Sequence, residues 1–256
     1  MLGRLFHRFA KTPRRLVRVP DGRRLYAIGD IHGQLDLLEG LLARICADEK
    51  ARGGPRGELI FLGDLINRGP QSAQVIDYLV SVQAERPETR FLLGNHEEVL
   101  LKALGGDESA LRIFHHMGGT QTILSYGIAR EAYEAVDYDG LAAMLQAAVP
   151  PTHRDFLASF EDIIVEGGYV FVHAGVRPGV SLVEQQPRDL RWIRHEFLST
   201  SSHPIPGMVI IHGHTIHEDI IEQPGRIGLD TGGYRTGMLS AMGFEGEERW
   251  ILQQRS

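Results

Sequence analysis

Five short polar signatures occur in a fixed order along this chain, and each follows an apolar run of the kind that forms a β-strand. Strand ends that are distant in sequence can meet in a folded sheet, so their polar side chains can converge on one place. Carboxylate and amide oxygens combined with imidazole nitrogens suit a pair of divalent metals, and two neighbouring metals suit displacement at phosphorus. We interpret the signatures together as a binuclear metallophosphoesterase site; they are Gly29–Gly33 (GDIHG), Gly63–Gly69 (GDLINRG), Gly94–Glu97 (GNHE), His173–Gly175 (HAG) and Gly213–Thr215 (GHT).

The predicted ligands form two sets that share one carboxylate. Asp30 and His32 are two residues apart on an extended turn, so both side chains can bind the same metal. Asp64 ends the next strand, and its two carboxylate oxygens can bridge two metals. The first metal is assigned Asp30, His32 and Asp64, and the second is assigned Asp64, Asn95, His173 and His214.

The signatures resemble those of the PPP-type phosphoprotein phosphatases and their bacterial and phage relatives, which include the symmetrical diadenosine tetraphosphatases. The resemblance spans about residues 25–240. It implies an α/β fold of the calcineurin-like superfamily, a four-layer α/β/β/α metallophosphoesterase sandwich of two mixed sheets. It also implies two divalent metal ions, with manganese expected ahead of iron or zinc, and a hydroxide that bridges them and attacks phosphorus in line.

The resemblance implies further roles for residues close to the predicted ligands. His96 matches the general acid that protonates the leaving oxygen, and Arg68 matches an arginine that binds the phosphate. Arg194 is the predicted second phosphate-binding arginine. Asn95 is expected to contact substrate as well as metal, and Tyr234 to line the substrate cleft.

Asn67 is the one departure from the phosphatase pattern, which usually has Asp at this position. That Asp partners the acid histidine and stabilises its protonated form. Asn67 can hydrogen-bond to His96 but brings no charge, so a protonated imidazole is less favoured. An alkoxide leaving from phosphoserine needs a proton most, whereas a phenolate or a phosphate leaves more readily without one. The tetraphosphatases also lack an acid here, so Asn67 weakens the phosphoserine interpretation.

Three functions follow from these observations. The first expectation is a metal-dependent phosphoprotein phosphatase acting on phosphorylated Ser or Thr, with Tyr as a further target. The alternative is a symmetrical bis(5'-nucleosyl)-tetraphosphatase. A regulator that recognises phosphate without hydrolysing it comes third, because the chain has both a complete ligand set and the pair His96 and Arg68.

The elements that must position these residues alternate at first between strand and helix. Helices are predicted at Leu35–Glu49, Ser72–Ala84 and Glu97–Leu104, which gives a β-α-β-α-β order and a mainly parallel sheet. A helical insertion is predicted at about 105–160. The remaining segments are predicted as strands without helices between them, and these form a second mixed sheet; they are Ile163–Glu166, Tyr169–Val172, Met208–Ile211, Arg226–Leu229, Leu239–Phe244 and Trp250–Gln253.

The composition is that of a globular enzyme, with 256 residues, 43% hydrophobic content and a net charge of −6 that argues against a general nucleic-acid binder. The single cysteine, Cys46, excludes an intramolecular disulfide and is expected to be buried in its helix. No apolar run is long enough for a transmembrane helix, and none has the form of a secretory signal. We therefore expect a cytoplasmic protein whose partner is a phosphoprotein or a phosphorylated small molecule.

The N-terminus has a different composition. Residues 1–24 form a basic arm, while residues 25–256 are predicted to be a single catalytic domain. Leu2, Leu5, Phe6 and Phe9 fall on one helical face of the arm, which could contact an anionic membrane surface or serve as an organelle presequence. The favoured interpretation is a solvated arm that docks back on the acidic body.

Overall fold

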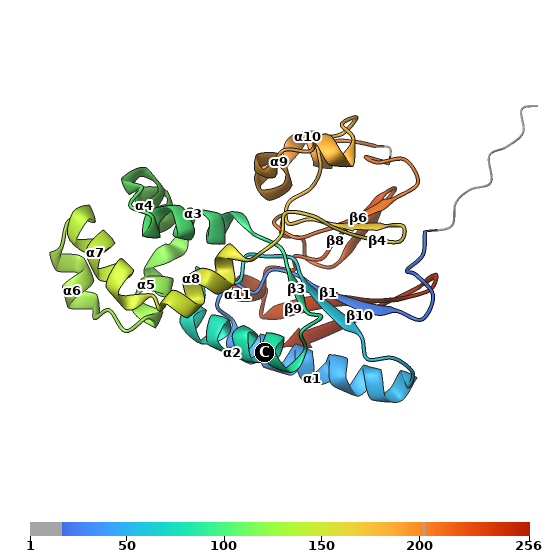
Figure 1. The fold of residues 1–256 in the computed structure, drawn as a ribbon, viewed down its shortest axis with the longest axis horizontal. Coiled ribbons are helices and arrows are strands. Elements are labelled where there is room, and N and C mark those ends of the chain that lie inside the picture. Colours follow the sequence, from blue (N-terminus) through green and yellow to red (C-terminus); the bar gives the residue numbers. More distant parts are fainter. Residues whose placement is uncertain (1–16, 202) are drawn as a thin grey trace, which may run out of the picture.

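The computed structural model describes residues 17–201 and 203–256, which form four layers (Figure 1). Two five-stranded sheets pack face to face, and helices cover the outer face of each sheet. The α/β/β/α sandwich that the family resemblance implies is therefore confirmed. The predicted arm lies largely outside the described residues, because these begin at Val17.

The first sheet has the strand order β10-β9-β1-β2-β3. β1, β2 and β3 run parallel, and helices α1 and α2 make the crossovers between them, as the alternating pattern predicts. β9 pairs antiparallel with β1, and β10 pairs antiparallel with β9. The elements of this part are β1 (Arg24–Ile28), α1 (Leu35–Arg52), β2 (Glu58–Phe61), α2 (Ser72–Glu85), β3 (Arg90–Phe91), α3 (Asn95–Leu104), β9 (Met238–Glu245) and β10 (Glu248–Arg255).

The second sheet has the order β4-β5-β6-β8-β7, with β5, β6 and β8 parallel and the two edge strands antiparallel to their neighbours. Two short helices, α9 and α10, lie over its outer face. The elements are β4 (Ile164–Glu166), β5 (Tyr169–Phe171), the 3₁₀ turn η2 (Leu182–Glu184), α9 (Pro187–Trp192), α10 (His195–Leu198), β6 (Val209–His212), β7 (Ile221–Gln223), β8 (Arg226–Gly228) and the short helix α11 (Gly233–Thr236).

The predicted helical insertion is confirmed between β3 and β4, where it extends to one side of the sandwich (Figure 1). The insertion consists of short helices. Asp137 is the N-cap of one of them, and its side chain accepts a hydrogen bond from the backbone N–H of Gly140. The apolar faces of the insertion share one core with α1 and α2. The elements are α4 (Glu108–Phe114), the π-helix η1 (His115–Gly119), α5 (Thr120–Ser125), α6 (Arg130–Ala135), α7 (Tyr138–Ala148) and α8 (Pro151–Ala158).

The two-residue repeat of the strands explains the layers. In β5, Tyr169 and Phe171 point into the core between the sheets, while Val170 points to the opposite side, under α9 and α10. In β1, Leu25 likewise faces the second sheet and Tyr26 faces α1. Both faces of each sheet are therefore apolar. One face packs against the other sheet, and the opposite face packs against helices.

Two expectations about the C-terminal part are wrong. β9 and β10 belong to the first sheet, where β9 pairs with β1, and not to the second sheet. A strand pattern identifies a strand but not the edge with which it pairs. Helices α9 and α10 also lie between β5 and β6, where no helix was predicted, because segments this short have no helical period to detect.

The first described residues pack against the body of the protein. Arg23 forms ion pairs with Glu58 and Glu166, and Arg24 pairs with Glu245 at 2.8 Å. These contacts agree with an arm whose end docks on acidic groups, while residues 1–16, including its proposed amphipathic face, lie outside the described residues. Cys46 is exposed on α1, so the expectation of a buried thiol is wrong. Among the described helices, none has the length and apolar character needed to cross a bilayer.

Candidate metal centre

The five signatures meet at one edge of the sandwich, as their positions after strands predict. Asp30 and His32 follow β1, Asp64 follows β2, and Asn95 is the first residue of α3 after β3. His173 follows β5 and His214 follows β6, in the second sheet. The carboxyl ends of parallel strands share an edge, so both sheets contribute predicted ligands to the cluster, four after strands of the first sheet and two after strands of the second.

In the described part of the chain, positive φ angles at non-glycine residues are confined to this cluster. The described residues include five non-glycine positions with positive φ, and all five lie in the signatures: His32, Asp64, Asn67, Arg68 and His214, with φ between 49° and 71°. Such conformations are unfavourable for side-chain-bearing residues and persist where the surrounding structure imposes them. The strained backbone conformations at these positions direct the side chains into the cluster.

Glu97 holds two of the signature loops together. Its buried carboxylate accepts hydrogen bonds from the backbone N–H groups of Asp64 (2.9 Å), Leu65 (2.9 Å) and Gly94 (3.1 Å). Burial raises the pKa of Glu97 to about 7. The carboxylate of Glu97 therefore supports the two loops through their backbone N–H groups.

Two groups of ligand atoms share Asp64. The first group contains His32, Asp64 and His96, and the second contains Asp64, His173 and His214. In each group the ligand atoms lie within 4.8 Å of one another. Asn95 joins the second group, because its Oδ1 atom is 3.0 Å from Nε2 of His173. The shared carboxylate is the arrangement that the sequence predicts for a bridging ligand.

Hydrogen bonds to the backbone orient two of the predicted histidine ligands. Nδ1 of His32 donates to the carbonyl of Ile66 at 2.8 Å, and Nδ1 of His173 donates to the carbonyl of Leu62 at 2.8 Å. Each ring therefore carries its hydrogen on Nδ1 and directs the lone pair of Nε2 into the cluster. This support is typical of histidines that bind metals.

Asp30 lies beside the two groups and belongs to neither of them. Its carboxylate accepts the backbone N–H of His214 at 3.0 and 3.2 Å. Burial, followed by the charges of Asp230 and Asp64, raises the pKa of Asp30 well above its ordinary value. Oδ2 of the neighbouring, buried Asp230 has no hydrogen-bond partner among the described residues.

The donor set fits divalent cations. Burial raises the pKa of Asp64 to about 7, which shows that a negative charge at this place is costly without a compensating cation. Nε2 of His214 is buried without a partner in the described chain, while Nδ1 of the same ring is 3.1 Å from Nε2 of His173. Carboxylate oxygens, an amide oxygen and imidazole nitrogens suit manganese, iron or zinc.

His96 has a neutral partner. The side-chain amide of Asn67 lies 2.8 Å from Nδ1 of His96, and both residues are buried. The other end of this amide contacts the hydroxyl of Thr122 at 2.7 Å. Thr122 was missed by the sequence analysis, because it lies 55 residues from Asn67 within the helical insertion and carries no motif.

Arg68 and Tyr234 lie at the same cluster. Nη1 of Arg68 is 3.0 Å from Nε2 of His32, and Nη2 is 3.3 Å from Nε2 of His96. The guanidinium carbon lies 4.8 Å from the ring centre of Tyr234, whose ring also meets His32 edge to face at 5.3 Å. Both residues therefore stand where the sequence analysis expects substrate to bind.

Arg194 is better placed than Arg191 to contact substrate. Arg191 pairs with Asp162 at 2.6 Å and with Glu98 at 3.6 Å, which ties it to the body of the protein. Arg194 is exposed and lines a cavity of about 500 Å³. Burial, followed by the charges of His173 and Arg194, lowers the pKa of His214, so Arg194 lies within electrostatic reach of the cluster.

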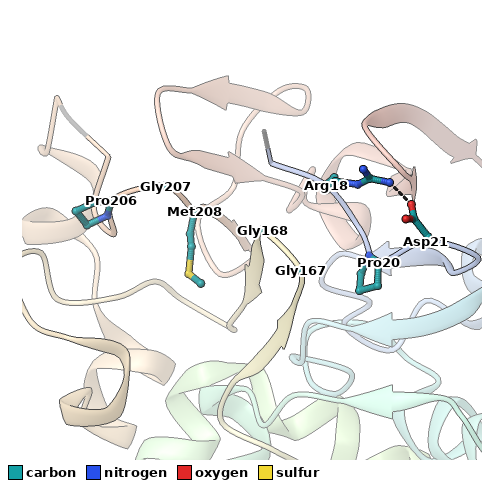
Figure 2. A pocket seen from close by; sticks show the side chains of 8 residues that line it. All are labelled: Arg18, Pro20, Asp21, Gly167, Gly168, Pro206, Gly207 and Met208. Carbon is teal, nitrogen blue, oxygen red and sulfur yellow. Dashed lines mark hydrogen bonds and ion pairs between the residues drawn. The ribbon is translucent and has the colours of Figure 1, made fainter. Parts of the chain in front are cut away.

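The cavity of about 560 Å³ in Figure 2 lies away from this chemistry. It opens where the described chain begins, between the turn that joins β4 to β5 and the segment before β6. None of the residues that line it belongs to the polar cluster; they are Arg18, Pro20, Asp21, Gly167, Gly168, Pro206, Gly207 and Met208. The candidate metal centre is therefore identified by the chemistry of its residues and not by the volume of a cavity.

Comparison with known families agrees with this geometry. The model of the family described as calcineurin-like phosphoesterase matches residues 23–227. A symmetrical bis(5'-nucleosyl)-tetraphosphatase from Methylococcus capsulatus is 33% identical over 154 residues, which cover 60% of this chain and 44% of that protein. The match therefore spans less than half of the length of this relative.

Solved structures show likeness in fold. A structure described as a candidate diadenosine tetraphosphatase superposes with a TM-score of 0.64 at 23% identity and covers 93% of this chain and 97% of its own. A serine/threonine phosphatase from Saccharomyces cerevisiae gives a TM-score of 0.55 at 13% identity, with 93% of this chain and 81% of that chain covered. At these identities the likeness concerns the fold and not the substrate.

Proposed function

The chain belongs to the calcineurin-like phosphoesterase family of hydrolases, and from this premise we propose that it uses two divalent metals to cleave phosphoanhydride bonds in dinucleoside polyphosphates. The ligands proposed for the metals are those of the sequence analysis, and their donor chemistry supports the assignment. Asp30, His32 and Asp64 hold one metal, and Asp64, Asn95, His173 and His214 hold the other. Manganese is the proposed metal.

The residues of the site have complementary roles. The two metals, when bound, supply a water molecule acidic enough to attack phosphorus at neutral pH. Arg68 and Arg194 bind phosphate oxygens, a task suited to the guanidinium fork. Tyr234 lines the cleft, and His96 donates to the leaving oxygen. Water supplies the new oxygen of the cleaved phosphoryl group, and the electron pair of the broken P–O bond stays with the leaving phosphate.

One observation carries the choice of substrate: the partner of His96 is the neutral amide of Asn67, at 2.8 Å. A neutral amide stabilises a protonated imidazole less than a carboxylate would, so the site is poorly equipped to protonate an alkoxide. A phosphate leaving group needs this help least. The tetraphosphatase named among the relatives points in the same direction, and we therefore place this activity ahead of phosphoserine hydrolysis, the first expectation from the sequence.

A comparison of three substrates with one manganese-loaded sample tests the proposal. We expect a higher kcat/KM for diadenosine tetraphosphate than for a phosphoserine peptide, with p-nitrophenyl phosphate also hydrolysed. Symmetrical cleavage gives ADP as the sole nucleotide product, which chromatography would establish. A higher kcat/KM for the phosphoserine peptide would indicate a protein phosphatase instead.

Asn67→Asp is expected to shift this preference. Asp tolerates the positive φ of position 67, which is 71°, and would place a carboxylate next to His96. A favourable change of about one pKa unit in the histidine corresponds to about 1.4 kcal/mol, or roughly a tenfold change in rate. The ratio of kcat/KM for phosphoserine to that for p-nitrophenyl phosphate should therefore rise about tenfold. An unchanged ratio, with equal metal content in both proteins, would show that Asn67 does not determine the substrate preference.

A further inference from the structure

The cavity of about 500 Å³ that Arg194 lines lies between the loop after β5 and the helices α9 and α10. Two more arginines, Arg177 and Arg188, line it as well. Pockets that bind small molecules have volumes of roughly 300–1,000 Å³. We propose that this cavity is a second substrate subsite, in which Arg188 binds a phosphate of one nucleoside diphosphate half of the substrate. The inference rests on the proposed function, because that function supplies a substrate with several phosphates.

Two hydrogen bonds hold α9, which forms one wall of the cavity, against the elements that carry the predicted metal ligands. The backbone N–H of Ala174, the residue after His173, donates to the carbonyl of Leu190 at 2.8 Å. The indole N–H of Trp192 donates to the carboxylate of Glu98 in α3 at 2.8 Å. The cavity is therefore fixed beside the candidate metal centre.

Two of the three arginines have no acidic partner. Arg177 is engaged, because its Nε and Nη2 atoms each donate to a carboxylate oxygen of Asp189 at 2.7 Å. Arg188 and Arg194 are exposed, and within residues 17–201 and 203–256 neither side chain has a hydrogen bond or an ion pair. A guanidinium only donates hydrogen bonds and its fork matches phosphate oxygens, so these two side chains are available for an anion.

The charge of the cavity differs from that of the whole chain. Arginines outnumber acids in its lining, whereas the chain carries a net charge of −6. A hollow of positive charge raises the local concentration of anions. The cavity therefore favours a polyanion over a neutral or cationic ligand.

The number of arginines and the presence of an indole favour a nucleotide. A phosphomonoester has one phosphate, for which the proposed metals and Arg68 suffice. Arg188 adds a further donor beyond Arg194, which suits a chain of phosphates. The half-buried ring of Trp192 also lines the cavity, and aromatic rings bind nucleobases by stacking. We therefore assign the cavity to a nucleoside diphosphate group.

Arg188→Gln tests the inference. The loss of one charged hydrogen bond to phosphate should reduce kcat/KM for diadenosine tetraphosphate about tenfold, mainly through a higher KM. The value for p-nitrophenyl phosphate should fall much less, because this substrate has a single phosphate. Arg188 is exposed, so the variant should keep the Tm of the wild type.

Arg56→Gln is the matched control. Arg56 is also exposed and loses the same charge, but it precedes β2 and so lies at the opposite end of that strand from Asp64. This variant should keep the wild-type ratio of the two kcat/KM values. A wild-type ratio in Arg188→Gln, or an equal change in both variants, would overturn the inference. A wild type that hydrolyses p-nitrophenyl phosphate but not diadenosine tetraphosphate would instead overturn the proposed function.

Calorimetric titration with ADP and AMP gives a second measurement that does not depend on turnover. In manganese-loaded protein, Arg188→Gln should raise the Kd of ADP about tenfold and that of AMP much less, because the single phosphate of AMP is held at the metals. Equal weakening of both nucleotides would indicate a general effect of charge and overturn the inference. Weaker binding of a phosphoserine peptide with acidic neighbours, with the Kd of ADP unchanged, would overturn it in favour of a protein substrate.

Discussion

Asp64→Asn is expected to reduce kcat/KM by on the order of a thousandfold for every phosphate substrate. Asp64 is the one residue shared by the two groups of ligand atoms, so the loss of its charge weakens both proposed metal sites at once. Metal ions contribute several kcal/mol of transition-state stabilisation, and about 4 kcal/mol corresponds to a factor of a thousand. Elemental analysis of the dialysed protein should show a loss of both metals.

For Asp64→Asn, a loss of activity caused by unfolding can be distinguished from one caused by loss of metal. Asn adopts the positive φ of position 64, which is 50°, as readily as Asp, and it removes a buried charge. The metal-free variant should therefore have a Tm no lower than that of the metal-free wild type. Added manganese should raise the Tm of the wild type more than that of the variant.

Asp139→Asn makes the same chemical change at an exposed position and serves as the control. It should retain metal and activity. Chelation of the wild type should abolish hydrolysis, and manganese should restore it. Full activity in a sample shown to be free of metal would refute the assignment of a metal centre.

His96→Asn and Arg68→Asn are expected to have different dependences on the leaving group. A donor to the leaving oxygen typically contributes between a hundredfold and ten-thousandfold in rate, and most where the leaving group is poor. His96→Asn should therefore reduce kcat for phenyl phosphate by about a hundredfold or more, and kcat for p-nitrophenyl phosphate by roughly tenfold. The measurement is kcat for both substrates with metal content matched.

Arg68→Asn should reduce kcat/KM by about a hundredfold for both substrates, because a hydrogen bond from a charged group to phosphate contributes about 1.5–3 kcal/mol in either case. Asn is chosen over Ala because position 68 has a φ of 69°, where Ala would add strain. Equal losses for both substrates in both variants would show that His96 does not act on the leaving group.

The sequence by itself determined which residues form the cluster and which sheet edge they share. Asp30 and Asp64 directly follow apolar strand segments, and parallel strands joined by helices must bring their carboxyl ends together. The position of the helical insertion was also predictable, because it interrupts the alternation of strand and helix. These features depend on order along the chain and on local periodicity.

The tertiary structure decided the pairing of the last strands. The residues of β9 show that it is a strand, but only packing showed that it pairs with β1. Long-range pairing depends on which edge remains open once the parallel strands are in place, and no local pattern contains that information. The exposure of Cys46 likewise depends on which face of α1 meets the sheet.

The tertiary structure also decided the surroundings of His96. The sequence showed that Asn67 lacks a charge, but Thr122, whose hydroxyl contacts the side-chain amide of Asn67, comes from an insertion 55 residues away. A lone Thr in a helix carries no signal of its own. Hydrogen-bond direction depends on the full set of donors and acceptors that folding brings into contact, so it exists only once the insertion has packed against the loop that carries Asn67.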